Sequence, residues 1–320
     1  MKKILLIFVS IFAILSISCN NIGPDPEPIT VTITSPEDSQ EFIKGDIVTI
    51  SATVNEKSDL YFVAFFIDDV DMGCDFEPPY EYQWDTGMAK NSDHSIYVEA
   101  WDMKDNSGTS NVIHVTLITS ITDIDGNQYN IIKIGSQYWL KENLIVTHYR
   151  NGDSIPNVTV DEDWIIQTDG AWCSYNNSSM FDKVYGHLYN WFTVKDDRGL
   201  APEGWHVATL NEWQVLIEFL GGDGVAGGKL KEFGNTHWNI PNTGATNESG
   251  FTALPSGYRS TYYDGEFFHL GYNAHFWMLQ ESSDMYAEYI HLHYDFPNVF
   301  ISNEDKRDGF SVRCIKNQEN

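Results

Sequence analysis

The sequence predicts a multidomain protein in which an all-β sandwich is followed by an α+β domain. The chain has 320 residues, 42% of them hydrophobic and 14% aromatic, which is enough material for two cores. Residues 29–118 alternate between apolar and polar positions in short runs, as half-buried strands do. Helix-like segments and then glycine-spaced aromatic runs follow between residues 186 and 277, an order typical of an α+β domain.

The first 28 residues are expected to deliver and attach the protein. Lys2 and Lys3 precede an apolar run, and Ser18 then precedes Cys19, which is the layout of a secretory signal peptide over residues 1–18. The sequence around Cys19 resembles a bacterial lipobox, in which the cysteine receives lipid; an ordinary thiol is the alternative. Residues 19–28 contain three prolines and are expected to form an extended tether. These features predict a protein anchored by lipid to the outer membrane of a cell envelope, facing the surface or the periplasm.

Residues 29–118 are predicted to fold as the sandwich. Six or seven apolar runs are separated there by clusters of Pro, Gly, Asp and Asn, which are turn residues. The stretch from Ala100 to Asp102 and the turn Asp105–Gly108 resemble the penultimate strand and following turn of bacterial immunoglobulin-like domains. No Cys-Trp-Cys framework is present, so an antibody-type domain is not expected. Such a module most often acts as a spacer or an interaction surface.

Helix signals mark the second domain. Gly186–Val194 is predicted to be a helix because its apolar side chains share one face. Thr209 as the N-cap and Glu212 three residues later form a capping box, so a second helix is expected to begin there and to end at Gly221-Gly222. From Gly227 onward we expect a loop-rich stretch that leads to short strands closed by glycine turns.

Five sequence runs carry a resemblance to a known family: IGSQYW (134–139), GHLYNW (186–191), PEGWHV (202–207), the aromatic run at 250–277 and GFSVRC (309–314). With them, residues 121–317 resemble the Fibrobacter succinogenes major paralogous domain, whose relatives include C-type-lectin-like and formylglycine-generating-enzyme-like proteins. The resemblance implies a C-type-lectin-like α+β fold. It does not carry over an activity, because the oxidase relatives use two closely spaced cysteines where this chain has Cys314 alone, and the tripeptides of calcium-dependent lectins do not occur.

The net charge of the chain limits the classes of molecule that it is expected to bind. The chain has 19 basic and 46 acidic residues, and its formal net charge is −27. Such a chain repels nucleic acid and anionic lipid, so we expect no nucleic-acid partner. Cations or neutral ligands such as glycans, or another surface protein, are compatible with it. The alternative is that the acidity only keeps an exposed protein soluble.

Three cysteines remain besides Cys19. They are Cys74, Cys173 and Cys314, an odd number in a compartment where disulfides form. Cys173 and Cys314 lie in the same predicted domain and Cys74 lies in the other. The economical pairing is therefore a Cys173–Cys314 disulfide.

The sequence contains no strong signal for catalysis. A nucleophile elbow, a P-loop and a dinucleotide-binding glycine fingerprint all fail to appear. His291 and His293 are predicted to share one face of a strand, a spacing that can chelate Zn²⁺, but no third ligand is identifiable. We therefore expect no metal, no cofactor and a binding or structural role. An enzyme acting on envelope or environmental polysaccharide is the alternative, although no pair of carboxylates stands out for it.

A ligand site is predicted in the turn STYYDGE, residues 260–266. Tyr262 and Tyr263 are expected at its tip beside Asp264. An exposed tyrosine ring can stack on the apolar face of a sugar while Asp264 accepts hydrogen bonds from its hydroxyl groups. The polar loop Asn176–Ser179 is the alternative place for a site, and a solvated hairpin with a structural role is the alternative to any site.

Overall fold

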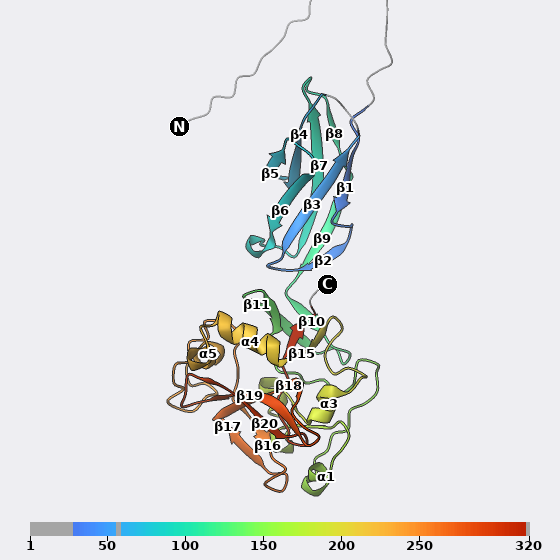
Figure 1. Cartoon of the computed structure of the whole chain (residues 1–320). Coiled ribbons are helices and arrows are strands. Elements are labelled where there is room, and N and C mark those ends of the chain that lie inside the picture. The colour runs from blue at the N-terminus through green and yellow to red at the C-terminus, as the bar shows by residue number, and fades with distance from the viewer. Residues whose placement is uncertain (1–27, 56–58, 318–320) are drawn as a thin grey trace, which may run out of the picture. The chain divides into compact units, whose positions relative to one another are not determined.

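The computed structural model describes residues 28–55 and 59–317 (Figure 1). The predicted signal peptide, Cys19 and the tether up to residue 27 lie outside this part of the chain. The contacts divide the described residues into two compact units, with those of 28–40, 48–84 and 94–115 in the first and those of 41–47, 85–93 and 116–317 in the second. None of the helices in the described residues is long and apolar enough to cross a lipid bilayer.

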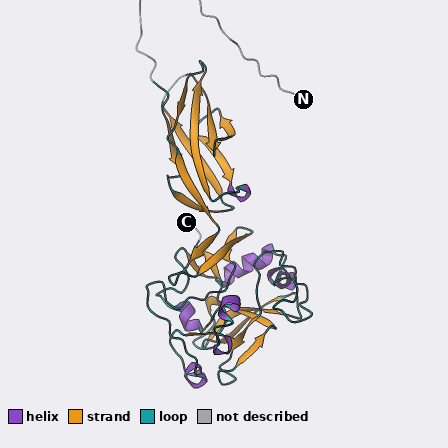
Figure 2. Ribbon diagram, turned by 180° about the vertical axis from the view of Figure 1, so that it is seen from behind, coloured by secondary structure: helices purple, strands orange, loops and turns teal. Residues whose placement is uncertain are grey.

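The first unit contains the predicted sandwich, which is built almost wholly of strands (Figure 2). One sheet has the order β1-β3-β6 and the other β2-β9-β7-β4-β5, with β8 paired to β7. In β7 every second side chain is buried, among them Ile96, Val98 and Ala100, as two sheets packed face to face require. The strands are Val31–Ser35 (β1), Gln40–Ile43 (β2), Ile47–Val54 (β3), Leu60–Ile67 (β4), Val70–Asp75 (β5), Tyr80–Asp85 (β6), Asp93–Asp102 (β7), Ser107–Thr109 (β8) and Ile113–Ile118 (β9), with a 3-10 turn at Thr86–Met88.

The second unit contains three sheets. They have the orders β10-β11-β12-β21-β15, β13-β14 and β17-β16-β18-β19-β20. The last of these sheets holds the aromatic run and positions the candidate site. The strands are Ser120–Thr122 (β10), Gln128–Ile134 (β11), Gln137–Leu140 (β12), Trp172–Cys173 (β13), Leu188–Tyr189 (β14), Trp205–Val207 (β15), Ser256–Arg259 (β16), Phe267–Leu270 (β17), Asn273–Glu281 (β18), Tyr286–His293 (β19), Val299–Asp305 (β20) and Cys314–Lys316 (β21).

Helices cover one face of that sheet. Leu216 and Ile217 of α4 and Leu230 of α5 pack in one hydrophobic cluster with Phe276 of β18 and Ile290 of β19. Both helices lie beside this sheet in Figure 1. The cluster therefore buries one side of the sheet, and the candidate site lies on its opposite side. The helices are Asp161–Ile165 (α1), Asp182–Tyr185 (α2), Trp191–Lys195 (α3), Leu210–Phe219 (α4) and Asp223–Leu230 (α5), with a 3-10 turn at Tyr175–Asn177.

The helix predicted at 209–220 is confirmed, but the one predicted at 186–194 begins later. Thr209 caps α4 and forms the expected capping box with Glu212. Leu188 and Tyr189 instead form strand β14, and α3 begins at Trp191 after Asn190, whose side chain accepts a hydrogen bond from the Thr193 amide. The strand forms because Leu188 and Tyr189 pair with β13, and the main chain of Tyr189 also pairs with Phe310. Local periodicity contains neither contact.

The loop-rich stretch predicted from Gly227 begins only after α5 ends at Leu230, and it then continues to β16. Gly227 and Gly228 lie inside α5. A Cβ atom at Gly227 would lie 2.1 Å from the carbonyl oxygen of Asn298, and one at Gly228 would lie 2.2 Å from that of Gly244. Glycine is present because other main chain packs directly against this helix, not because the chain bends there.

Candidate functional site

The candidate site lies on the face of the β17-β16-β18-β19-β20 sheet opposite the one that α4 and α5 cover. His275 of β18 is directly opposite His291 of β19, and His291 is opposite Phe300 of β20. Directly opposite residues in adjacent strands point to the same side of a sheet, so these three rings share one face. The residues between them point to the helix side and form its apolar core: Ala274, Phe276, Ile290 and Leu292.

A cavity of about 450 Å³ opens on this face. Its walls come from all five strands of the sheet, from the turn between β16 and β17, and from the segment after β20. The size is within the range of small-ligand pockets. We call it the tyrosine–histidine cavity, and it is lined by Tyr258, Ser260, Tyr262, Tyr263, His269, Asn273, His275, Tyr289, His291, Glu304, Asp308 and Phe310.

Packed aromatic rings form the floor of the tyrosine–histidine cavity. The ring centroid of Phe310 lies 4.3 Å from that of Trp277, 4.8 Å from that of Tyr289 and 4.9 Å from that of His275. Phe310 belongs to the run 309–314, which the chain brings back against β18 through the Trp277 amide and the Ser311 carbonyl. The floor is therefore rigid and apolar, and it joins two family-like runs that are distant in sequence.

Polar atoms in the cavity wall lack partners. His275 and Asn273 are buried, with exposed fractions of only 5% and 8%. The Nδ1 atom of His275 and the Oδ1 atom of Asn273 nevertheless make no hydrogen bond. The Nδ1 atom of His291 is in the same condition. A buried polar group without a partner costs about 1–3 kcal/mol, so such groups are rare away from functional sites. A ligand that offers hydrogen bonds would remove this cost.

Two carboxyl groups face the cavity. Asp308 is 2% exposed, and its Oδ1 atom accepts hydrogen bonds of 2.7 and 2.6 Å from the amide and hydroxyl of Thr261. Burial nevertheless raises the pKa of Asp308 to about 7. Burial also raises the pKa of Glu304, which faces the same space. Near neutral pH the Asp308 carboxyl group is thus partly protonated.

The imidazoles of His275 and His291 are neutral at pH 7. Burial lowers the pKa of His291 to about 4, and the neighbouring His293 lowers it further. Burial also holds the pKa of His275 well below its usual value, with a smaller contribution from His291. No Lys or Arg lines the cavity. A neutral imidazole offers one donor and one acceptor to a ligand.

Of the three predicted turn residues, two line the cavity and the third does not. Tyr262 and Tyr263 are 83% and 53% exposed and both line the cavity. Asp264 lies in the same exposed turn with a φ of 52°, and its side chain is not part of the cavity wall. The alternative loop 176–179 contributes no residue to this cavity either. Asp308 and Glu304, not Asp264, are the acidic residues that line this cavity.

The sequence also missed the partners of His291. The predicted strand face that carries His291 and His293 exists in β19. His275, which lies opposite His291, was not singled out, and only the register of β18 against β19 brings them together. The ring centroids are 5.6 Å apart. Over residues 28–55 and 59–317, no group of three His, Cys, Asp or Glu side chains is placed to hold a metal ion.

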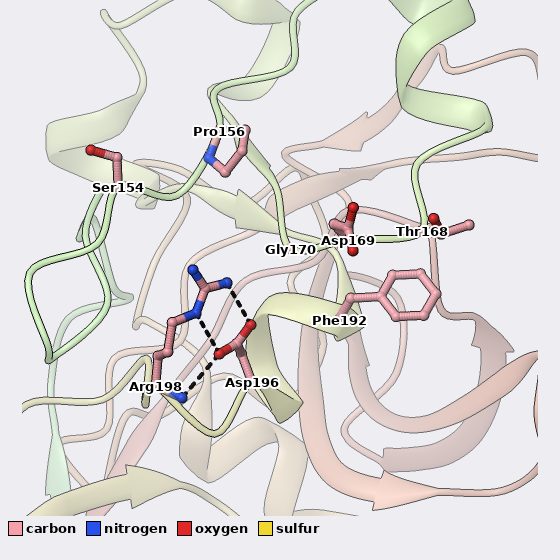
Figure 3. A pocket seen from close by; sticks show the side chains of 8 residues that line it. All are labelled: Ser154, Pro156, Thr168, Asp169, Gly170, Phe192, Asp196 and Arg198. Carbon is pink, nitrogen blue, oxygen red and sulfur yellow. Dashed lines mark hydrogen bonds and ion pairs between the residues drawn. The ribbon is translucent and has the colours of Figure 1, made fainter.

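A second cavity of about 450 Å³ lies near α3 (Figure 3). Its most prominent charged group is Arg198, whose Nε and Nη2 atoms donate hydrogen bonds of 2.8 Å each to the carboxylate of Asp196. The guanidinium also stacks over the ring of Tyr149 and reaches Asp153. Because this arginine is already paired, the cavity offers a ligand fewer free groups than the tyrosine–histidine cavity does.

The predicted Cys173–Cys314 disulfide is not formed in the structure, where both cysteines are free and buried. Cys173 pairs with Leu188 in the β13-β14 hairpin and packs in a small cluster with Trp164. Cys314 lies in β21 opposite Val207, in a different and larger cluster. Each thiol packs in its own apolar cluster, so the two cysteines form no disulfide although both lie in the same domain. Cys74 is also free and is exposed.

Comparison with solved structures gives short, low-scoring likenesses. Fibronectin(III)-like modules of Clostridium thermocellum CbhA are 27% identical over 28% of this chain and 94% of theirs, with a TM-score of 0.26. An endo-beta-1,4-mannanase from Thermotoga petrophila is 18% identical over 31% of this chain and 21% of its own, with a TM-score of 0.24. The Bacteroides ovatus protein SGBP-B of a mixed-linkage glucan utilization locus, in complex with a heptasaccharide, is 14% identical over 36% of each chain, with a TM-score of 0.22. These TM-scores are too low to indicate a shared overall fold.

Family models identify both parts of the chain. No curated protein sequence matches it. Residues 30–98 match the bacterial Ig domain, in agreement with the sandwich. Residues 132–316 match the Fibrobacter succinogenes major domain. Since this second match covers more than half of the 320 residues, the chain belongs to the Fibrobacter succinogenes major domain family.

Proposed function

We propose that this chain is a lipid-anchored protein of the bacterial cell envelope whose C-terminal domain binds glycan chains in the tyrosine–histidine cavity. The observation that carries the proposal is the set of unpartnered buried atoms, Nδ1 of His275 and Oδ1 of Asn273, in the wall of an aromatic cavity. A sugar hydroxyl both donates and accepts, so it satisfies either tautomer of the imidazole and the amide oxygen. The apolar face of the sugar ring then meets the aromatic side chains.

The charges of the site support a ligand that is not anionic. No cation lines the cavity, and Glu304 and Asp308 bring negative charge to it. Phosphorylated, sulfated or carboxylated ligands would be repelled at this position. Tyr262 and Tyr263 stand at the exposed rim, where their rings meet at a centroid distance of 4.8 Å. In this proposal they hold the part of the glycan that extends out of the cavity.

The proposed lipid anchor and cellular location rest on the sequence. The signal peptide over residues 1–18 and the lipobox-like Cys19 support attachment to the outer membrane through lipid. The bacterial Ig domain then acts as a spacer between the lipid and the binding domain. The C-type-lectin-like fold of the second domain is part of the same proposal, and it rests on the resemblance of the family to those proteins.

Binding to immobilised and soluble glycans tests the proposal. Replacing Tyr262 and Tyr263 together by Ala should weaken binding at least about tenfold, which corresponds to about 1.4 kcal/mol. Tyr286→Ala is the matched control, because Tyr286 is an exposed tyrosine of the same sheet that does not line the cavity. Equal affinity of the double variant and the wild type would place the site elsewhere. For the anchor, labelled fatty acid should enter the wild type but not the Cys19→Ala variant.

Hydrolysis of a polysaccharide is the second candidate function. The observation that favours it is the presence of Glu304 and Asp308 in one cavity, a pair that the sequence did not single out. A carboxyl group whose pKa is raised to about 7 can act as a general acid near neutral pH. Product formation followed in the same glycan incubations separates the two functions: released reducing ends that disappear in Glu304→Gln would favour the enzyme.

A further inference from the structure

The two carboxyl groups of the tyrosine–histidine cavity have no counter-charge. The ion pairs of the described residues include neither Glu304 nor Asp308. The nearest basic residues along the chain are engaged elsewhere. Lys306 pairs with Glu281 and donates to the Asp284 carbonyl, and Arg307 donates both sides of its guanidinium to Asp305.

One oxygen of Asp308 remains available. Both hydrogen bonds from Thr261 end on Oδ1, and the described residues offer Oδ2 no donor. Taking a carboxylate out of water without a cation is costly, which is why the free protein retains a proton on this group near neutral pH. A ligand that brought a positive charge would supply the missing partner.

The other walls of the cavity also favour a cation. Neutral imidazoles at His275 and His291 offer an acceptor nitrogen each. The rings of Tyr258, Tyr289 and Phe310 present aromatic surface, which attracts an ammonium group. A protonated amine has three N–H donors for these acceptors, whereas a hydroxyl group has one.

We propose that the tyrosine–histidine cavity selects glycans that carry a free, protonated amino group over glycans that carry only hydroxyl or N-acetyl groups. The selection arises because Asp308 and Glu304 face the cavity without any cation of the protein, among aromatic rings and unpartnered polar atoms. This inference rests on the proposed function, because it assumes that the cavity receives a glycan. It adds the substrate class, which is an amino sugar unit.

Oligosaccharides of glucosamine, N-acetylglucosamine and glucose with the same linkage and length provide the test. They differ only in carrying an amine, an acetamide or a hydroxyl at one position. Titration calorimetry of the wild type should show the glucosamine oligomer binding at least about tenfold more tightly than either of the others. Equal or weaker binding of the glucosamine oligomer would overturn the inference, while binding of none of the three would overturn the proposed function itself.

Variants test whether the preference for the amine arises from the carboxyl groups of this cavity. Asp308→Asn should reduce the ratio of the two affinities, amine over acetamide, to within about twofold, and Glu304→Gln should reduce it in the same direction if the first variant does not fold. Glu218→Gln, an exposed carboxylate of α4 on the helix side of the sheet, is the matched control and should keep the wild-type ratio. A ratio that falls equally in Glu218→Gln would assign the preference to the acidic surface as a whole and overturn the assignment to this cavity.

Discussion

The Nε atom of Arg313 donates a hydrogen bond of 2.8 Å to Oδ1 of Asn143, which lies 170 positions earlier in the chain. The Nη1 atom of the same guanidinium donates to the carbonyl oxygens of Leu140 and Phe251, at 3.0 Å each. Arg313 is almost wholly buried, and its guanidinium carbon lies 4.2 Å from the ring centroid of Phe251. One side chain thus joins the segment at 140–143 to two of the family-like runs, at 250–277 and 309–314.

Replacing Arg313 by Lys should destabilise the C-terminal domain strongly. An ammonium group cannot reproduce the planar set of donors, so at least two buried acceptors lose their partners. We expect a loss of at least about 3 kcal/mol in the free energy of unfolding, measured by urea denaturation of the full chain. Arg198→Lys is the control, because Arg198 is an exposed arginine of the same domain and its replacement should leave the midpoint near that of the wild type. Equal effects of the two variants would contradict the role given to Arg313.

Thiol labelling checks the correction to the disulfide prediction. Burial raises the pKa of Cys173 to about 12 and raises that of Cys314 well above its usual value, so neither forms a thiolate in the folded protein. A thiol reagent should label Cys74 in the native protein, and Cys173 and Cys314 only after denaturation without a reductant. A peptide containing both Cys173 and Cys314 in a non-reducing map would show that the disulfide forms after all.

The glycines of α5 should respond in opposite directions to replacement by alanine. Helix propensity alone favours alanine over glycine by about 1 kcal/mol. At Gly224 a Cβ atom meets no atom within 4 Å, so Gly224→Ala should raise the melting temperature. At Gly228 it would lie 2.2 Å from the carbonyl oxygen of Gly244, so Gly228→Ala should lower it. An increase in both variants would mean that the main chain of residue 244 does not pack against α5.

Asp308 should make stability depend on pH in a defined direction. Its pKa is about 7 in the folded protein and about 3.9 in an unfolded chain. Between those values the folded state holds a proton that the unfolded state has lost, so the contribution of this group to stability falls as pH rises from about 4 to 7 and is constant above. Asp308→Asn removes this titration and keeps an oxygen to accept the Thr261 hydrogen bonds.

Urea denaturation at several pH values isolates this effect. The stability of Asp308→Asn relative to the wild type should increase between about pH 4 and 7. The buried histidines His275 and His291 act in the opposite direction, because their lowered pKa values make the folded state more stable as pH rises, but they are common to both proteins and cancel in the difference. A difference that does not vary with pH would show that Asp308 titrates normally.

Local signals predicted the elements whose stabilisation is local. The capping box of Thr209 and Glu212 lies within one helical turn, and the alternation in β7 reports a strand with one buried face, so both could be inferred from neighbouring residues. The aromatic run at 250–277 likewise predicted strands and exposed tyrosines at 262 and 263. Gly227 and Gly228 misled the same reasoning, because the main chain that packs against them comes from residues 244 and 298.

The sequence by itself determined the domain order, the family, the acidic character and the exposed tyrosine turn. Only the tertiary structure decided that His275 faces His291, that Asp308 and Glu304 rather than Asp264 bring carboxyl groups to the cavity, and that Cys173 and Cys314 stay apart. The physical reason is that strand register, not sequence distance, places side chains on a common face of a sheet. A change of register by one residue would move each of those side chains to the other face, and short-range patterns carry no information about that register.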